Sequence, residues 1–329
     1  MTAPKIRMLV AEDSAYMLMA IRTMVKLDPR IEIVGEARDG IQAVEMARAL
    51  RPDIVTMDVN MPALDGITAT RRIMAETPTV VIMLSSMTEE GLAITDDALA
   101  AGAVDHMPKS LSAVDVDIAT IATGFAQKIA LWGASARTVR LGPASLPPIP
   151  PATDLLVIAG GYGSTLVAGA LLQALPALPC PVLVALDEIP ASQTLSAVRY
   201  FSTLTGRTAQ EGRHRSVLAP GSLTVLPGGR KSALKGAGGF LTLDLRTADP
   251  DSDILASAVA AVRHPAVALL SGAARPLDGL AAGRDRLAAL FVQDPATCAD
   301  PALPGAALAA GLSPSFLTFP FDMRRSRAA

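Results

Sequence analysis

The first 131 residues alternate short apolar runs with longer segments in which apolar residues recur at helical spacing. The apolar runs cover residues 6–11, 31–37, 53–57, 80–84 and 103–107, and helices are expected after Ser14 and over 41–50, 64–74, 89–100 and 114–131. Strict alternation of strand and helix favours parallel strands, with the connecting helices on both faces of the sheet. The sequence therefore predicts an α/β domain built on a five-stranded parallel sheet.

Polar side chains stand at the ends of four of these five strands. Ligands of open α/β sheets bind outside the carboxyl ends of the strands, so these side chains are expected to share one site. Clustered carboxylates repel unless a cation joins them, and carboxylates together with water suit Mg²⁺. We predict that the cation is held by carboxylates, that Asp58 accepts a phosphoryl group, and that a hydroxyl and an ammonium contact that group. The residues are Glu12 and Asp13 after the first strand, Asp58 after the third, Ser85 after the fourth and Lys109 after the fifth.

Residues 5–131 resemble the response-regulator receiver domain, which has a flavodoxin-like fold. The resemblance is carried by the acidic pair, by Asp58 within MDVNMP, by Asp65-Gly66, and by the serine and lysine at the later strand ends. It implies Mg²⁺-dependent phosphorylation of Asp58 by a histidine kinase of chemotaxis type. It also implies that Asn60 offers its backbone carbonyl to the metal.

Two positions depart from the receiver pattern. His106 stands three residues before the lysine, where receivers usually carry an aromatic or bulky residue, and Ser110 follows the lysine in place of the usual proline. We interpret His106 as a partly buried switch residue. These departures concern how the signal is passed on more than phosphorylation itself.

Composition narrows the remaining possibilities. A chain of 329 residues is expected to hold about two domains. A formal net charge of −2 provides no general basic surface for nucleic acid, and two cysteines without metal-ligand spacing fit a reducing cytoplasm. The longest apolar stretch, residues 259–274, is interrupted by Arg263, His264 and Pro265, so no membrane insertion is expected.

The predicted domain order is a receiver over residues 1–132, a linker over 133–153 and a second domain over 154–329. Residues 141–153 read LGPASLPPIPPAT, with five prolines and no charge, which is typical of an extended, stiff linker. Residues 133–140 either extend the last receiver helix or join the linker.

The second domain is predicted as a doubly wound α/β domain with one antiparallel excursion. Strands are expected over 154–159, 181–186, 223–226, 266–270 and 290–293, with residues 239–245 returning as the hairpin partner of 223–226. Helices are expected after Ser164, over 192–204, 253–262 and 277–287, and near 306–310. The glycine-rich turn over 160–163 lacks the GxGxxG spacing of dinucleotide sites. Whether it binds a small anion at the start of the following helix is left open by the sequence.

Residues 154–320 resemble the catalytic domain of the chemotaxis protein-glutamate methylesterase. The landmarks are LAPGSLTVLPGGR at 218–230 and VQDPATC at 292–298, and the order of receiver and second domain is that family's arrangement. The family uses a serine nucleophile, a histidine base and an orienting aspartate. Here Gly161 stands at the serine position, Glu188 replaces the histidine before Ile189-Pro190, and Asp278 is the displaced aspartate in a segment two residues longer.

The resemblance therefore implies a degenerate catalytic triad. Removing a triad member costs on the order of 10⁴- to 10⁶-fold in rate. We predict that the second domain acts by binding a protein, such as a chemoreceptor, the kinase or another signalling protein. One alternative is an active methylesterase or deamidase with relocated residues, drawn from Ser164, Ser271 and His214. Another is a phosphate sink that only drains the kinase.

Overall fold

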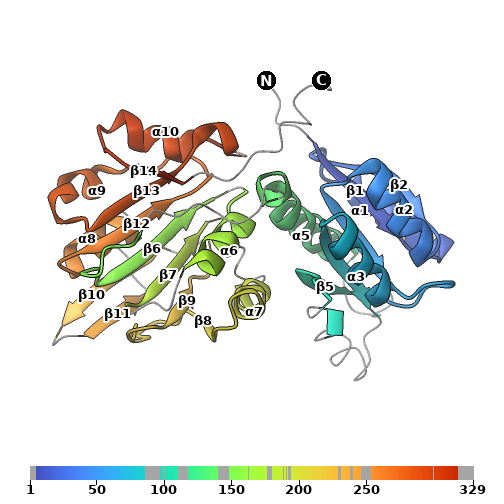
Figure 1. The fold of residues 1–329 in the computed structure, drawn as a ribbon, viewed down its shortest axis with the longest axis horizontal. Helices are drawn as coiled ribbons and strands as arrows, with labels where there is room; N and C mark the ends of the chain where they lie inside the picture. The colour runs from blue at the N-terminus through green and yellow to red at the C-terminus, as the bar shows by residue number, and fades with distance from the viewer. Residues whose placement is uncertain are drawn as a thin grey trace. The chain divides into compact units, whose positions relative to one another are not determined.

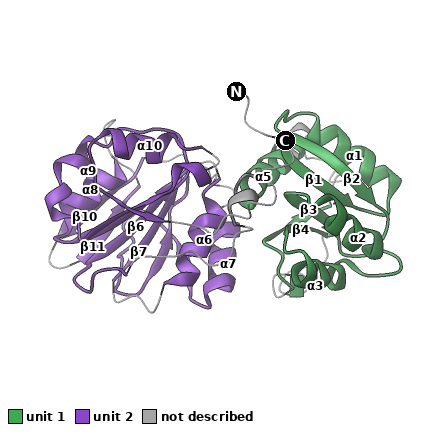
Figure 2. Ribbon diagram, turned by 45° about the horizontal axis from the view of Figure 1, so that its top comes forward, with its two compact units in different colours: residues 1–140 green, residues 141–329 purple. Residues whose placement is uncertain are grey.

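The protein divides into two compact units, Met1–Arg140 and Leu141–Ala329, which are coloured separately in Figure 2. The structure is a computed structural model. It describes residues 5–85, 97–98, 101–109, 118–139, 148–161, 163–175, 180–187, 189, 191, 194–228, 231–237, 240–245, 253–298 and 300–317.

Unit 1 is built on a five-stranded parallel sheet with the strand order β2-β1-β3-β4-β5, which confirms the predicted fold (Figure 1). Its strands are β1 (Ile6–Ala11), β2 (Ile31–Ala37), β3 (Ile54–Asp58), β4 (Val80–Ser85) and β5 (Asp105–Pro108). The chain reverses its winding between β1 and β3, and such a switch point opens a crevice at the carboxyl ends of the two strands. The fold thus places a ligand site next to the ends of β1 and β3.

Four helices of unit 1 are described: α1 (Ala15–Val25), α2 (Gly40–Leu50), α3 (Gly66–Glu76) and α5 (Ile118–Val139). The first three begin at side-chain caps, because Ser14, Asp39 and Asp65 each accept a hydrogen bond from the first turn. Helices α1 and α5 contact each other, as do α2 and α3. The helix predicted over 89–100 lies almost entirely outside the described residues.

Two glycines of unit 1 allow close approach between elements. A side chain at Gly66 would clash with the carbonyl oxygen of Asp58, so α3 starts directly against the end of β3. Gly133 lies against the side chain of Ile6, which lets α5 pack closely on β1. Helix α5 continues to Val139, so residues 133–139 of the predicted linker are helical, whereas 141–147 lie outside the described residues.

Unit 2 is built on a seven-stranded parallel sheet with the order β14-β13-β12-β6-β7-β9-β8, as expected for a doubly wound α/β domain. The strands are β6 (Leu155–Gly160), β7 (Val182–Leu186), β8 (Ala209–Glu211), β9 (Leu223–Val225), β12 (Pro265–Leu269), β13 (Ala289–Gln293) and β14 (Ser315–Leu317). The short edge strands β8 and β14 were not expected from the sequence. The large apolar core of this unit lies between the sheet and the helices that cover it.

The antiparallel excursion exists, but its predicted pairing is wrong. Strand β11 (Phe240–Asp244) pairs with β10 (Ala233–Ala237), not with the run at 223–226. That run forms β9, which is wholly buried between β7 and β8 in the main sheet. A buried apolar strand is better satisfied by neighbours on both sides than in an isolated hairpin.

The helices of unit 2 follow the predicted order, with shifted ends. They are α6 (Thr165–Ala174), α7 (Thr194–Thr205), α8 (Ile254–Ala261), α9 (Asp278–Ala282) and α10 (Ala302–Ala309). Helix α9 is shorter than the predicted 277–287, because a 3₁₀ turn over Arg284–Arg286 replaces its second half. Among the described residues, none of the helices has the length and apolar character needed to cross a lipid bilayer.

Candidate functional site

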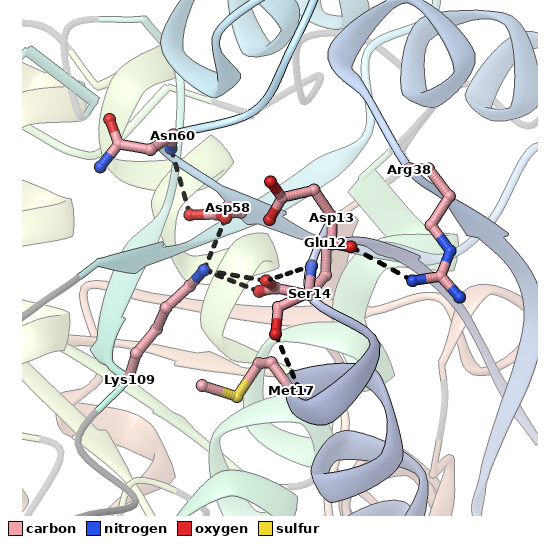
Figure 3. A network of polar contacts seen from close by, with 8 residues as sticks. All are labelled: Glu12, Asp13, Ser14, Met17, Arg38, Asp58, Asn60 and Lys109. Atoms are coloured by element: carbon pink, nitrogen blue, oxygen red, sulfur yellow. Dashed lines mark hydrogen bonds and ion pairs between the residues drawn. The ribbon is translucent and has the colours of Figure 1, made fainter.

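The candidate site of unit 1 is a group of three carboxylates at the switch point of the sheet. Asp58 is the last residue of β3 and is 3% exposed, while Glu12 and Asp13 directly follow β1. Glu12 is fully buried and Asp13 is exposed. One oxygen atom from each of the three lies within 4.8 Å of the others, and Figure 3 shows the group.

Lys109 joins two of these carboxylates. Its Nζ lies 2.6 Å from Asp58 Oδ2 and 2.8 Å from Glu12 Oε2. Its backbone N–H donates to the carbonyl oxygen of Ser85 at 2.7 Å, which holds the end of β5 beside the end of β4. Burial raises the pKa of Glu12, and the hydrogen bond from Lys109 opposes that rise. The ammonium thus compensates part of the negative charge at this sheet edge.

The oxygen atoms of the site fit a hard divalent cation. Glu12 Oε2 is buried and faces the ammonium of Lys109 at 2.8 Å, and Asp58 Oδ1 accepts only the backbone N–H of Asn60 among the hydrogen bonds shown in Figure 3. The exposed Asp13 leaves the group open to solvent on one side. Mg²⁺ prefers such oxygen ligands together with water, so the three carboxylates suit it.

The other two predicted residues of unit 1 lie on the neighbouring strands. Ser85 is buried at the end of β4, one residue beyond the partner of Asp58 in the sheet register. His106 lies on β5, where its side chain is 27% exposed and its Nδ1 is 3.9 Å from Asp105 Oδ1. Strand β4 separates β5 from β3, so His106 stands farther from Asp58 than Ser85 does.

In unit 2, Gly161 lies in the turn after β6, packed against the turn after β12. Its N–H donates to the carbonyl oxygen of Ser271 at 2.7 Å. A side chain at Gly161 would place its Cβ 3.1 Å from the Cα of Gly272, which is tighter than ordinary contact. At the position that resembles the nucleophile site, the backbone of Gly161 therefore packs directly against the backbone of residues 271–272.

An ion pair that the sequence did not reveal lies at the same sheet edge. Arg275, between β12 and α9, pairs with Asp187 at the end of β7. Arg275 Nη1 is also 3.9 Å from Asp253 Oδ1, and Asp253 caps α8 by accepting from two backbone N–H groups. Burial lowers the pKa of Arg275 and raises that of Asp253. The predicted position Glu188, next to this pair in the chain, lies outside the described residues.

We expect Arg275→Met to destabilise unit 2 by about 1–3 kcal/mol, because the largely buried Arg275 is the cation that pairs with the exposed Asp187 and the partly buried Asp253. Urea unfolding of the full chain, followed by circular dichroism, measures the shift. Arg284→Met is the matched control, since Arg284 faces Asp285 in an exposed pair and its loss should cost less than about 0.5 kcal/mol. Equal unfolding curves for the two variants would show that Arg275 does not hold these loops together.

The residues considered for a relocated triad come from distant strands. Ser164 is buried and its hydroxyl donates to the carbonyl oxygen of Gly161 at 2.7 Å. Ser271 is buried after β12, where its hydroxyl oxygen accepts the N–H of Asp300 at 2.9 Å. His214 follows β8, with its Nδ1 3.3 Å from Asp244 Oδ1 on β11.

The sheet order separates the two serines from His214. Strands β7 and β9 lie between β6 and β8, and β12 is one strand farther away. With about 4.8 Å between neighbouring strands, these separations are about 14 Å and about 19 Å at the sheet edge. A triad needs contacts of about 3 Å. Asp278, the predicted remaining aspartate, is exposed at the first residue of α9.

Comparisons with known proteins agree with both halves of this description. Residues 8–119 match the response regulator receiver domain, and residues 156–322 match the CheB methylesterase family. The chain is 32% identical to the protein-glutamate methylesterase/protein-glutamine glutaminase of Alkalilimnicola ehrlichii, over 94% of this chain and 95% of that protein. It is 36% identical to the protein of the same name from Thermotoga maritima, over 74% of this chain and 73% of that one.

One solved structure with similarity to unit 1 is the response regulator domain of Thermotoga maritima CheB. It is 44% identical and covers 39% of this chain and 96% of that chain, with a TM-score of 0.36. A relative that shares about a third of its residues over nearly the whole chain establishes the family. The chain belongs to the CheB family of protein-glutamate methylesterases, with a response-regulator receiver domain followed by a methylesterase domain.

Proposed function

We propose that the protein is a phosphorylation-controlled response regulator of chemotaxis type, with Asp58 as the phosphoryl acceptor. The observation that carries this proposal is the position of Asp58. It lies 2.6 Å from the ammonium of Lys109 and shares with Glu12 and Asp13 a cluster of oxygen atoms. The proposed donor is the phosphohistidine of a chemotaxis histidine kinase in the cytoplasm.

The carboxylates of Glu12, Asp13 and Asp58, with the backbone carbonyl of Asn60, would hold Mg²⁺, which supplies positive charge to the incoming phosphoryl group. A carboxylate oxygen of Asp58 attacks phosphorus; the new P–O bond forms as the P–N bond breaks and the imidazole leaves. The ammonium of Lys109 then pairs with a phosphoryl oxygen, and the hydroxyl of Ser85 donates a hydrogen bond to it.

We propose further that unit 2 delivers the output by binding a signalling protein. Gly161 offers no hydroxyl at the position that resembles the nucleophile, and the neighbouring loops are tied by the ion pair between Arg275 and Asp187. Movement of Ser85 and His106 on phosphorylation would change the surface that unit 1 presents. The proposed partners are a chemoreceptor, the kinase or another protein of the same pathway.

The runner-up is an active protein-glutamate methylesterase or glutaminase with relocated residues. It is favoured by the relatives that carry this name over most of the chain. It requires a hydroxyl, an imidazole and a carboxylate in contact, and the strand separations described above argue against Ser164 or Ser271 with His214.

Binding of a chemoreceptor cytoplasmic fragment tests the output. We expect the dissociation constant of the full chain to change about 5- to 150-fold when Mg²⁺ and beryllofluoride are added, because the two states of unit 1 differ in what they allow unit 2 to contact. Calorimetric titration measures both constants, with Mg²⁺ alone as the control. A dissociation constant that beryllofluoride leaves unchanged would contradict phosphorylation-controlled binding to receptors.

A further inference from the structure

A buried polar network joins strand β5 to helix α5 in unit 1. Asp105 is 4% exposed, Lys128 is 8% exposed and Trp132 is fully buried. Lys128 Nζ lies 2.7 Å from Asp105 Oδ2, and the indole N–H of Trp132 donates to the same oxygen at 3.0 Å. Asp105 Oδ1 accepts the backbone N–H of His106 at 2.8 Å. The carboxylate is therefore bonded on both of its oxygens.

Lys128 also makes a hydrogen bond to the backbone of strand β5. Its Nζ donates to the backbone carbonyl oxygen of His106 at 2.9 Å. Strand β5 has only four residues and stands at the edge of the sheet, so β4 is its one neighbouring strand. An edge strand presents unpaired backbone groups, and here a side chain from α5 bonds one of them. Lys128 thus contacts β5 at two points, the side chain of Asp105 and the main-chain carbonyl of His106.

The far end of the same strand leads to Lys109. Asp105 and His106 begin β5, Pro108 ends it, and Lys109 follows with its ammonium on Asp58 and Glu12. The position of that ammonium therefore depends on where β5 lies. The β4 ladder and the contacts of Lys128 hold the strand from two different elements.

We propose that Lys128 is a positioning residue for phosphorylation. From helix α5 its ammonium binds the Asp105 carboxylate and the His106 carbonyl and so fixes the position of β5. The position of β5 in turn determines where the ammonium of Lys109 lies relative to the phosphoryl group on Asp58. This inference rests on the proposed function of Asp58. It predicts that Lys128 influences phosphoryl transfer through Lys109 and leaves the carboxylates that hold Mg²⁺ in place.

The test measures the rate of phosphorylation of the full chain by acetyl phosphate in the presence of Mg²⁺, read on phosphate-affinity gels. Lys128→Met is expected to slow the reaction about 10- to 100-fold, because a misplacement of about 1 Å has effects of this size. Asp105→Asn with Lys128→Met removes both buried charges, so it remains usable if the single variant fails to fold. Lys26→Met, at an exposed position after α1, is the matched control and should keep the wild-type rate.

Two further readouts separate positioning from a general loss of structure. In a Lys109→Met background, Lys128→Met should change the rate less than about twofold, because residues that act through one group are not additive. The Mg²⁺ dissociation constant, measured by calorimetry, should stay within about twofold of the wild-type value in every Lys128 variant. Trp132 is the only tryptophan of the chain, so its emission shows directly whether the network is broken.

Slow phosphorylation that depends on Lys109, with unchanged Mg²⁺ binding, would support the inference. A folded double variant with the wild-type rate would overturn it, as would an equal loss of rate in the Lys109→Met background. Parallel losses of rate and of Mg²⁺ affinity would also overturn it, because they indicate a purely structural role. If the wild-type chain takes up no phosphoryl group, the proposed function fails first, and this outcome is distinct from the others.

Discussion

Asp58→Asn is expected to abolish phosphoryl uptake from a phosphorylated chemotaxis kinase, a loss of at least about 10³-fold. The amide cannot form the acyl phosphate, because the attacking carboxylate oxygen is gone. The substitution also removes one of three carboxylates from the cluster with Glu12 and Asp13, so Mg²⁺ affinity should fall as well. Transfer of labelled phosphoryl groups from the kinase measures the first effect, and calorimetry measures the second.

The matched control is Asp39→Asn. Asp39 also follows a strand of the same sheet and caps α2, and asparagine caps a helix about as well as aspartate does. This variant should therefore keep both its fold and its phosphorylation. If Asp58→Asn still took up label at the wild-type level, the acceptor would be a different residue, and the reading of the site would be wrong.

Methanol release from methylated chemoreceptors is expected to stay at background for the full chain activated with Mg²⁺ and beryllofluoride. The rate should lie about 10⁴- to 10⁶-fold below that of a family member with serine, histidine and aspartate in place. The reason is local: Gly161 carries no hydroxyl, and the hydroxyls of Ser164 and Ser271 bond to backbone groups. Gas chromatography of released methanol compares the two proteins on the same receptor preparation.

The variants Ser164→Ala, Ser271→Ala and His214→Ala make this comparison decisive. If the wild-type chain is inactive, none of the three should lower the background further. Release near that of the active family member would establish the runner-up, and the variant that lost it would then identify the nucleophile or the base.

The fold of both units could be predicted because its signals are local. Apolar runs of four to seven residues alternate with helical periodicity, and the polar residues that end the strands are read directly from the sequence. Parallel strands bring those ends to one edge, which is why Glu12, Asp13, Asp58 and Lys109 meet in the structure. Their proposed roles remain predictions.

The features that the sequence did not reveal depend on distant partners. Arg275 and Asp187 lie 88 residues apart, and neither belongs to a recognisable pattern. The pairing of β10 with β11 depends on β9 finding a place in the main sheet, which no local signal records. Residues 133–140 are open between helix and linker in the sequence, and the structure shows that Gly133 lies within α5 at its close contact with Ile6.

The glycine at the start of α3 limits how the site could respond to the proposed phosphorylation of Asp58. Gly66 lies directly against the carbonyl of Asp58, and its N–H donates to the carbonyl of Val59 at 2.9 Å. The start of α3 is therefore in close contact with the backbone of Asp58 and leaves no space between them. We therefore expect a phosphoryl group on Asp58 to displace the neighbouring strands β4 and β5 rather than α3.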